Sequence, residues 1–257
     1  MRIAILTRCY TTPVLDLLAK LTGDGLQMQC VFVERALWGN PFRSSLRLIE
    51  KLLKTEGVFC AIGAICRQLF RMFLKSDDVE AAFREFARLH NIEVVEIDDF
   101  NADKARDAMR TRNVDVGIVF GTRKLSVATF SIPHYGCINI HHGSLPYYRG
   151  SESLFWAMYN NEEYAGVTVH RIAERLDTGD ILATTSVRIK DYKYNQAVIQ
   201  SKLFEAGNDL LCAVLKEGSL AGVPQDESRA RYYSLPTKDE RRSLDKRLKA
   251  LRKACRE

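Results

Sequence analysis

Short apolar runs alternate with helical patterns along the first 160 residues. An apolar run at 2–7 precedes leucines at helical spacing in 11–21, and a second strand-like run follows at 26–33. The same alternation predicts further helices at 78–91, 102–112 and 151–160, and strands at 92–97, 114–120 and 137–140. Strands separated by helices favour a parallel sheet covered by helices, so we expect an α/β protein with a Rossmann-like, mostly parallel sheet.

The pattern changes after residue 160. Two strand-like runs at 166–171 and 181–189 lie close together around a turn-rich segment, as in a hairpin. An amphipathic pattern over 195–215 then predicts a long helix, and Gly218 stands where such a helix ends.

Composition excludes several classes of protein. Of the 257 residues 46% are hydrophobic and 27% charged, which is ordinary for a globular chain. No apolar run approaches the ~20 residues of a membrane span, and the N-terminal run is too short for a signal peptide. The seven cysteines form no CxxC pair and have no zinc-ligand spacing, so we expect reduced thiols and no metal. These features predict a cytoplasmic protein.

The formal net charge of +6 is concentrated in two segments. Residues 238–257 hold nine basic and four acidic side chains, and residues 43–75 hold seven basic and two acidic. We place the first segment in a basic C-terminal tail at 221–257, and the second in a helical insertion at about 42–75 of a domain at 1–220. The remaining body is slightly acidic, so nucleic acid is not the expected partner.

The role of the two basic segments stays open. Leu244, Leu248 and Leu251 recur at helical spacing among basic residues, which predicts a short basic amphipathic helix. Such a helix touches an anionic membrane or nucleic acid, or packs its leucines on the body or on a second subunit. Peripheral membrane contact and a homodimer are therefore both alternatives.

Candidate catalytic side chains lie where the strand at 137–140 meets a loop rich in Gly and Pro. Asn139 and His141 alternate along the strand and so share a face, whereas His142 faces the other side. In open parallel sheets ligands bind outside the carboxyl ends of the strands. An amide, an imidazole and a carboxylate from a nearby loop could polarise a carbonyl group and move a proton. The alternative is that these polar residues only cap the loop.

The chain also resembles the folate-dependent formyltransferases, a family of glycinamide ribonucleotide, methionyl-tRNA and sugar-nucleotide N-formyltransferases and formyltetrahydrofolate deformylases. The family pattern N-x-H-x-S-L-L-P-x-x-x-G is matched by Asn139, His141, Leu145, Pro146 and Gly150, with departures at Gly143 and Ser144. Residues 166–170 match the family's G-V-T-x-H block, and residues 176–181 match L-D-x-G-x-I.

This resemblance implies a formyltransferase fold and 10-formyltetrahydrofolate as cosubstrate, without a metal. Asn139 and His141 would bind the formyl oxygen, and Asp177 would orient His141 or an intervening water. The resemblance places these residues against the cosubstrate: Phe120, Gly121, Thr122, Arg123, Leu125, Leu176 and Asp180. The match is looser at Arg123 and Lys124, which replace apolar residues of the family, so a solvated loop is the alternative there.

The resemblance implies a primary amine as acceptor. The Gly-x-Gly-Ser phosphate cradle of glycinamide ribonucleotide enzymes is absent after the first strand, and only 37 residues follow Leu220, too few for the C-terminal barrel of methionyl-tRNA enzymes. We therefore expect an amino sugar nucleotide or a similar small amine, bound by Arg8, Arg149 and Gly150. The alternatives are a macromolecular or lipid-linked acceptor, including a methionyl-tRNA-like one, and hydrolysis of formyltetrahydrofolate by water.

Overall fold

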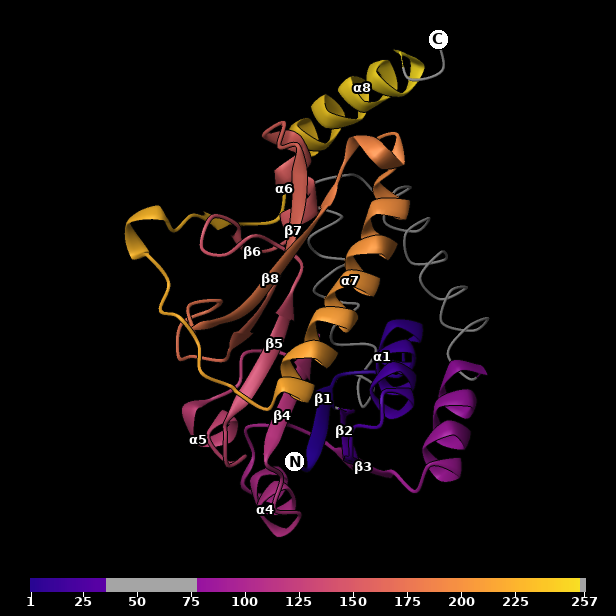
Figure 1. The fold of residues 1–257 in the computed structure, drawn as a ribbon, viewed down its shortest axis with the longest axis vertical. Coiled ribbons are helices and arrows are strands. Elements are labelled where there is room, and N and C mark those ends of the chain that lie inside the picture. Colours follow the sequence, from indigo (N-terminus) through magenta and orange to yellow (C-terminus); the bar gives the residue numbers. More distant parts are fainter. Residues whose placement is uncertain (36–77, 255–257) are drawn as a thin grey trace, which may run out of the picture.

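A seven-stranded sheet forms the centre of the computed structural model, which describes residues 1–35 and 78–254 (Figure 1). Its strands are β1 (Ile3–Thr7), β2 (Met28–Glu34), β3 (Glu93–Ile97), β4 (Val116–Phe120), β5 (Cys137–His141), β7 (Tyr164–Arg171) and β8 (Ile181–Arg188). They lie in the order β3-β2-β1-β4-β5-β7-β8. The pairs from β3 to β5 are parallel and the pairs β5–β7 and β7–β8 antiparallel. The mostly parallel sheet and its terminal hairpin are as predicted, and the predicted insertion at 42–75 lies outside the described residues.

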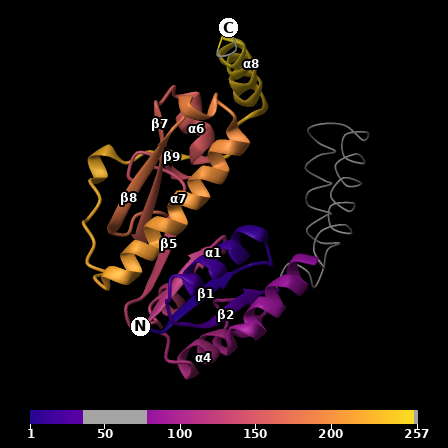
Figure 2. The same cartoon turned by 45° about the vertical axis from the view of Figure 1, so that its right-hand side comes forward.

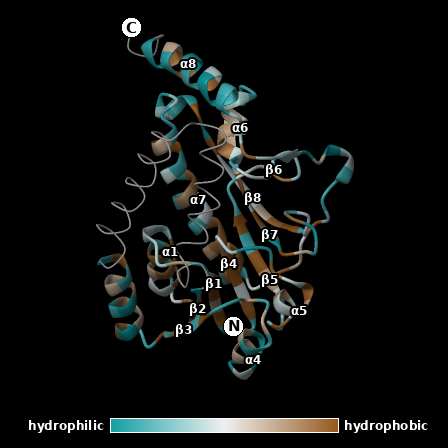
Figure 3. Cartoon of the chain, turned by 180° about the vertical axis from the view of Figure 1, so that it is seen from behind, coloured by the Kyte–Doolittle hydropathy of each residue, from teal (hydrophilic) through white to brown (hydrophobic). Residues whose placement is uncertain are grey.

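Helices cover both faces of this sheet (Figures 1 and 2). They are α1 (Thr12–Gly23), a helix over 78–89, α4 (Asp103–Thr111), α5 (Val127–Phe130), α6 (Ser153–Tyr159), α7 (Gln196–Glu217) and α8 (Lys238–Ala254). Ile3 and Ile5 pack in one apolar cluster with α1 and α7, whereas Ala4 and Leu6 pack with α4 in a second. Because both faces are covered, every residue of β1 is buried, and the central strands form the hydrophobic interior seen in Figure 3.

The ends of α7 follow from its sequence. The Asn195 side chain accepts a hydrogen bond from the backbone N–H of Val198, and Gly218 closes the helix in a left-handed conformation with φ of 75°. The helix therefore begins and ends within two residues of the predicted limits. Within the described part of the chain, no helix combines the length and apolarity that a membrane crossing requires.

The segment after residue 220 packs closely on the rest of the molecule. Strand β9 (Tyr232–Tyr233) pairs in parallel with β6 (Arg149–Gly150). Gly150 has φ of 96°, and a Cβ placed there would lie 2.3 Å from the carbonyl oxygen of Tyr233, so only glycine fits this pairing. Trp156 in α6 donates a hydrogen bond to the carbonyl of Ser234, and Leu244 and Leu248 of α8 are buried.

Candidate active site

A cavity of about 620 Å³ lies at the carboxyl ends of β4 and β5. One wall is the segment 119–125 at the end of β4, and the opposite wall is the loop 172–177 that leads from β7 toward β8. The start of α6 and the first half of α7 close the remaining side. The cavity therefore occupies the edge of the sheet at which parallel strands present ligands.

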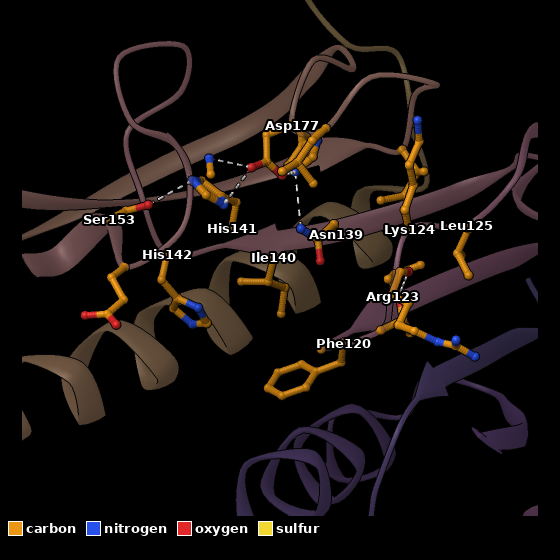
Figure 4. Close-up of a pocket in the computed structure, with 18 of the residues that line it drawn as sticks. Phe120, Arg123, Lys124, Leu125, Asn139, Ile140, His141, His142, Ser153 and Asp177 are labelled. Atoms are coloured by element: carbon orange, nitrogen blue, oxygen red, sulfur yellow. Dashed lines mark hydrogen bonds and ion pairs between the residues drawn. The ribbon is translucent and has the colours of Figure 1, made fainter. Parts of the chain in front are cut away.

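The structure places Asn139, His141 and Asp177 together at this cavity (Figure 4). Asn139 and His141 project from the same face of β5, and Asp177 approaches them from the loop 172–177. The His141 Nδ1 atom lies 3.7 Å from Asp177 Oδ2, and His170 Nε2 lies 3.8 Å from Asp177 Oδ1. His141 and Asp177 are each only 8% exposed, so their interaction is little screened by water.

The surroundings of His141 determine which nitrogen faces the cavity. His141 Nε2 lies 2.6 Å from the carbonyl oxygen of Tyr148 and 3.2 Å from Ser153 Oγ. A carbonyl oxygen only accepts hydrogen bonds, so we assign the Nε2 proton to this contact. Nδ1 is left facing Asp177, where it can accept a proton or, once protonated, donate one.

His170 holds the amide of Asn139 in place. His170 Nδ1 donates to the carbonyl oxygen of Arg171 at 2.8 Å, which leaves Nε2 to accept from Asn139 Nδ2 at 3.3 Å. Burial, together with the nearby His141, lowers the pKa of His170 to about 4, so the ring is neutral near pH 7. One amide hydrogen of Asn139 is thus engaged, and the second remains for a ligand.

The backbone around Asp177 fixes its carboxylate. The N–H of Gly150 donates to Asp177 Oδ2 at 2.9 Å, and Asp177 itself has φ of 54°, in the left-handed region. The Gln225 side chain donates to the carbonyl oxygens of Asp177 and Gly179 at 2.9 and 2.7 Å. Gly179 is required because a Cβ there would lie 2.0 Å from the carbonyl oxygen of Arg171.

Most residues expected against the cosubstrate border the cavity. Those that line it are Phe120, Gly121, Thr122, Arg123, Leu125 and Leu176. Asp180 does not line it. The Arg123 guanidinium is ion-paired with the buried Glu34 and lies 3.7 Å from Asp99, so its charge is already partnered.

Two of the residues expected to bind the acceptor lie elsewhere. Arg149 is 0% exposed and does not line the cavity, because its guanidinium is bound by Gln225 and Glu227, at 2.7 Å from each. The Arg149 guanidinium therefore binds side chains of the protein itself, where the sequence had led us to expect contact with the substrate. Arg8 does not line the cavity either, whereas Gly150 does and uses its N–H on Asp177.

His142 faces the side of β5 opposite His141, as expected (Figure 4). Its ring packs against Phe204 of α7 with centroids 4.3 Å apart, and its Nε2 atom is buried without a hydrogen-bond partner. Burial, with a further contribution from His141, lowers the pKa of His142 to about 4.

Some functional contacts were not predicted from sequence. Ser153 and Gln225 lie outside the three motifs, and no sequence signal relates them to His141 or Asp177. His170 does close the G-V-T-x-H block, but its hold on Asn139 depends on the antiparallel pairing of β5 with β7. In the described part of the chain no cluster of His, Cys, Asp or Glu is suited to hold a metal ion.

Sequence comparison relates the chain to one family. Residues 79–215 match the sequence profile of a family described as Formyl transferase. The methionyl-tRNA formyltransferase of Thermosynechococcus vestitus is 31% identical over 76% of this chain and 60% of its own length. The corresponding enzyme of Lachnospira eligens is 34% identical over 59% of this chain and 49% of its own length. The chain thus spans about half to three fifths of these relatives.

Solved structures show the same fold. Glycinamide ribonucleotide transformylase 1 from Symbiobacterium toebii superposes with a TM-score of 0.59 over 88% of this chain and 94% of that one, at 16% identity. HypX from Aquifex aeolicus superposes with a TM-score of 0.58 over 94% of this chain and 31% of that one, at 18% identity. The Rossmann-like formyltransferase fold that the motifs implied is therefore confirmed.

Proposed function

Because the chain belongs to the formyl transferase family, we propose that it transfers a formyl group from 10-formyltetrahydrofolate to a primary amine. The observation that carries this proposal is the convergence of Asn139, His141 and Asp177 at the cavity beside the end of β5. When bound, the cosubstrate supplies an electrophilic formyl carbon. The side chains of this protein bind the formyl oxygen and move the protons.

Asn139 and His141 supply donors for the oxygen of the formyl group. The Asn139 amide is oriented by His170 and keeps one hydrogen for a ligand, and His141 protonated at Nδ1 offers a second donor. Donors fixed in advance stabilise the negative charge that develops on a carbonyl oxygen under attack, each by about 3 kcal/mol.

Asp177 provides the base. Attack by an amine requires that a proton leave the amine nitrogen and that a proton reach the departing nitrogen. The Asp177 carboxylate lies 3.7 Å from His141 Nδ1 and is held by the Gly150 N–H, so it can accept the first proton. The His141–Asp177 pair can return it, directly or through water.

The cavity walls combine apolar side chains with a few polar groups, as a folate-sized cosubstrate requires. Phe120, Leu125 and Leu176 give an apolar lining beside the polar cluster. Residues 120–124 form part of the same wall. This division between apolar walls and a few convergent polar groups is typical of small-molecule sites.

For the acceptor, we propose an amine carried by an aminoacylated RNA. The support comes from relatives named methionyl-tRNA formyltransferase, at 28–38% identity. The amino sugar nucleotide expected from the sequence loses part of its support, because the buried Arg149 is unavailable to bind a phosphate. The amino sugar nucleotide is therefore the second candidate.

The test measures release of tetrahydrofolate from 10-formyltetrahydrofolate with three acceptors: methionyl-tRNA, a panel of amino sugar nucleotides, and water alone. We expect turnover with methionyl-tRNA and recovery of the N-formylated product. Turnover with an amino sugar nucleotide only would overturn the RNA acceptor, and formate release without any amine would identify a hydrolase. Wild-type rates retained by the Asn139→Ala/His141→Ala double variant would overturn the proposed site.

A further inference from the structure

Helix α8 is anchored to the body through one face. Leu244 is 1% exposed and Leu248 3% exposed, both within the main apolar cluster. Arg247 donates to the carbonyl oxygens of Met158 and Tyr159 at 2.6 and 3.0 Å, and Arg252 donates to that of Tyr194. These contacts place the apolar face of α8 against the end of α6, as Figures 1 and 2 show.

The opposite face of α8 carries a line of cations. Arg242, Lys246, Lys249 and Lys253 are exposed and recur at intervals of four, three and four residues, which places them on one side of an α-helix. We call these four residues the α8 stripe. With a rise of 1.5 Å per residue, the stripe is about 16 Å long.

The α8 stripe has few acidic neighbours. Among residues 1–35 and 78–254, Lys246, Lys249 and Lys253 form no ion pair. Arg242 pairs with Asp239 of the same helix at 3.5 Å, and both side chains are more than three-quarters exposed. Exposed pairs of this kind contribute little, so the charge of the stripe is available to a partner.

The start of α8 is joined to the rim of the cavity. Arg241, which precedes the stripe, pairs with Glu152 at 3.0 Å, and Glu152 lines the cavity. From this end α8 leads outward to the C-terminal end of the molecule (Figure 1). The start of α8 is therefore within reach of a long anionic ligand that has its reactive end in the cavity.

We propose that the α8 stripe binds the phosphate backbone of the RNA that carries the acceptor amine, a proposal that rests on the function proposed above. A row of unpaired cations binds polyanions by neutralising phosphates and releasing counterions. An amphipathic helix that inserts into lipid needs a free apolar face. In α8 the apolar residues Leu244 and Leu248 are already buried against the body, so no free apolar face remains for lipid. This favours RNA over a membrane.

The test compares two triple variants of the whole protein. K246Q/K249Q/K253Q removes three charges, and K246R/K249R/K253R keeps them; Gln and Arg both have high helix propensity, so α8 is preserved in each. Affinity for fluorescently labelled tRNA is measured by anisotropy over a series of salt concentrations. We expect the Gln variant to bind about tenfold more weakly, with a slope of log Kd against log salt smaller by about two to three, and the Arg variant to bind like wild type.

Formylation of methionyl-tRNA and binding to phosphatidylserine vesicles are measured on the same samples. If wild type formylates methionyl-tRNA but the Gln variant binds tRNA with unchanged Kd and salt slope, the stripe proposal is overturned and the proposed function stands. If tRNA binds through the stripe without being formylated, the stripe stands and the acceptor assignment fails. Absence of tRNA binding by wild type, or a loss of vesicle binding alone in the Gln variant, would also overturn the stripe proposal.

Discussion

A buried carboxylate explains the unusual charge at the loop that follows β4. The Glu34 side chain at the end of β2 is 3% exposed, and Arg123 reaches across to pair with it. Asn101 braces the same loop, because its side chain donates to the carbonyl of Lys124 at 3.1 Å and accepts from the N–H of Ser126 at 2.7 Å. The arginine that replaces an apolar residue of the family therefore holds one wall of the cavity on the sheet.

Replacing Arg123 by methionine should lower the free energy of unfolding by about 1 to 3 kcal/mol, because it leaves the buried Glu34 charge without a partner, although the half-exposed Arg123 is partly screened by water. The double variant Glu34→Gln/Arg123→Met removes that charge and should recover most of the loss. Urea unfolding followed by circular dichroism measures both values. Equal losses in the single and double variants would show that the loss does not come from an unpaired Glu34 charge.

The hydrogen bond from Asn139 to His170 leads to a catalytic prediction. Asn139→Ala removes one donor for the formyl oxygen and should lower kcat by about 10²- to 10³-fold. The thermal midpoint should change little, because Asn139 is only partly buried at the end of its strand. A kcat within threefold of wild type would remove Asn139 from the mechanism.

At the level of elements, α7 packs closely against β5, the strand that carries Asn139 and His141. Gly207 lies on the face of α7 that meets the sheet, and a Cβ there would lie 2.8 Å from Ile140 Cγ2 and 3.2 Å from Val167 Cγ1. Ile140 stands between Asn139 and His141 on β5. Any displacement of α7 therefore shifts the strand that carries two of the proposed catalytic residues.

Gly207→Ala should destabilise the protein by about 1 to 3 kcal/mol through overpacking, although alanine is the better helix former. It should also lower kcat, because β5 moves. Gly23→Ala at the end of α1 is the matched control, since nothing lies within 4 Å of its Cβ position, and it should be neutral or stabilising. Chemical denaturation and formylation rates of both variants provide the measurement, and equal stability of the two would contradict the packing argument.

Elements with strong local signals were predictable from the sequence, and elements made by distant pairing were not. Asn195 and Gly218 marked the ends of α7 because capping is local. Strands β6 and β9 have two residues each and form only because positions more than 80 apart in the chain meet. The resemblance to known motifs implied that Asn139, His141 and Asp177 belong to one site. The hydrogen bonds of Arg149 to Gln225 and Glu227 can be seen only in the folded structure.

At the level of the whole molecule, two buried histidines predict that stability depends on pH. The pKa values of His142 and His170 are both lowered to about 4, whereas histidine in an unfolded chain has a pKa of about 6.5. Between pH 4 and 6.5 the unfolded state therefore binds more protons than the folded state. The free energy of unfolding should fall as pH decreases through this window, by at most about 1.4 kcal/mol per pH unit for each histidine.

The variant His142→Phe isolates one of these contributions. Phenylalanine keeps the ring contact with Phe204 and removes the titrating group, so stability should fall less steeply with acid, by up to about 1.4 kcal/mol per pH unit. Comparing urea midpoints of variant and wild type at pH 5 and pH 7 cancels the contributions of carboxylates. Parallel changes in the two proteins would show that His142 is not neutral in the folded state.

The position of the basic residues in the fold also changes the interpretation of the net charge. The sequence placed positive charge in two segments, and a slightly acidic body argued against nucleic acid as partner. In the structure the basic tail contains α8, a largely hydrophilic helix (Figure 3) whose α8 stripe is exposed and whose Arg241 pairs with Glu152 at the cavity. A small charged surface close to a site can direct a large anionic substrate even when the whole protein is only modestly basic.

The pairing of β6 with β9 has a consequence for the order of events during synthesis. Gly150 donates to the Asp177 carboxylate from a strand that is completed only when Tyr233 pairs with it. On the ribosome, the sheet and Asn139 can form long before Tyr233 emerges, so the nascent chain would have a folded body with an unfinished site. Activity would then appear only after residue 233 has left the ribosome and β9 has paired with β6.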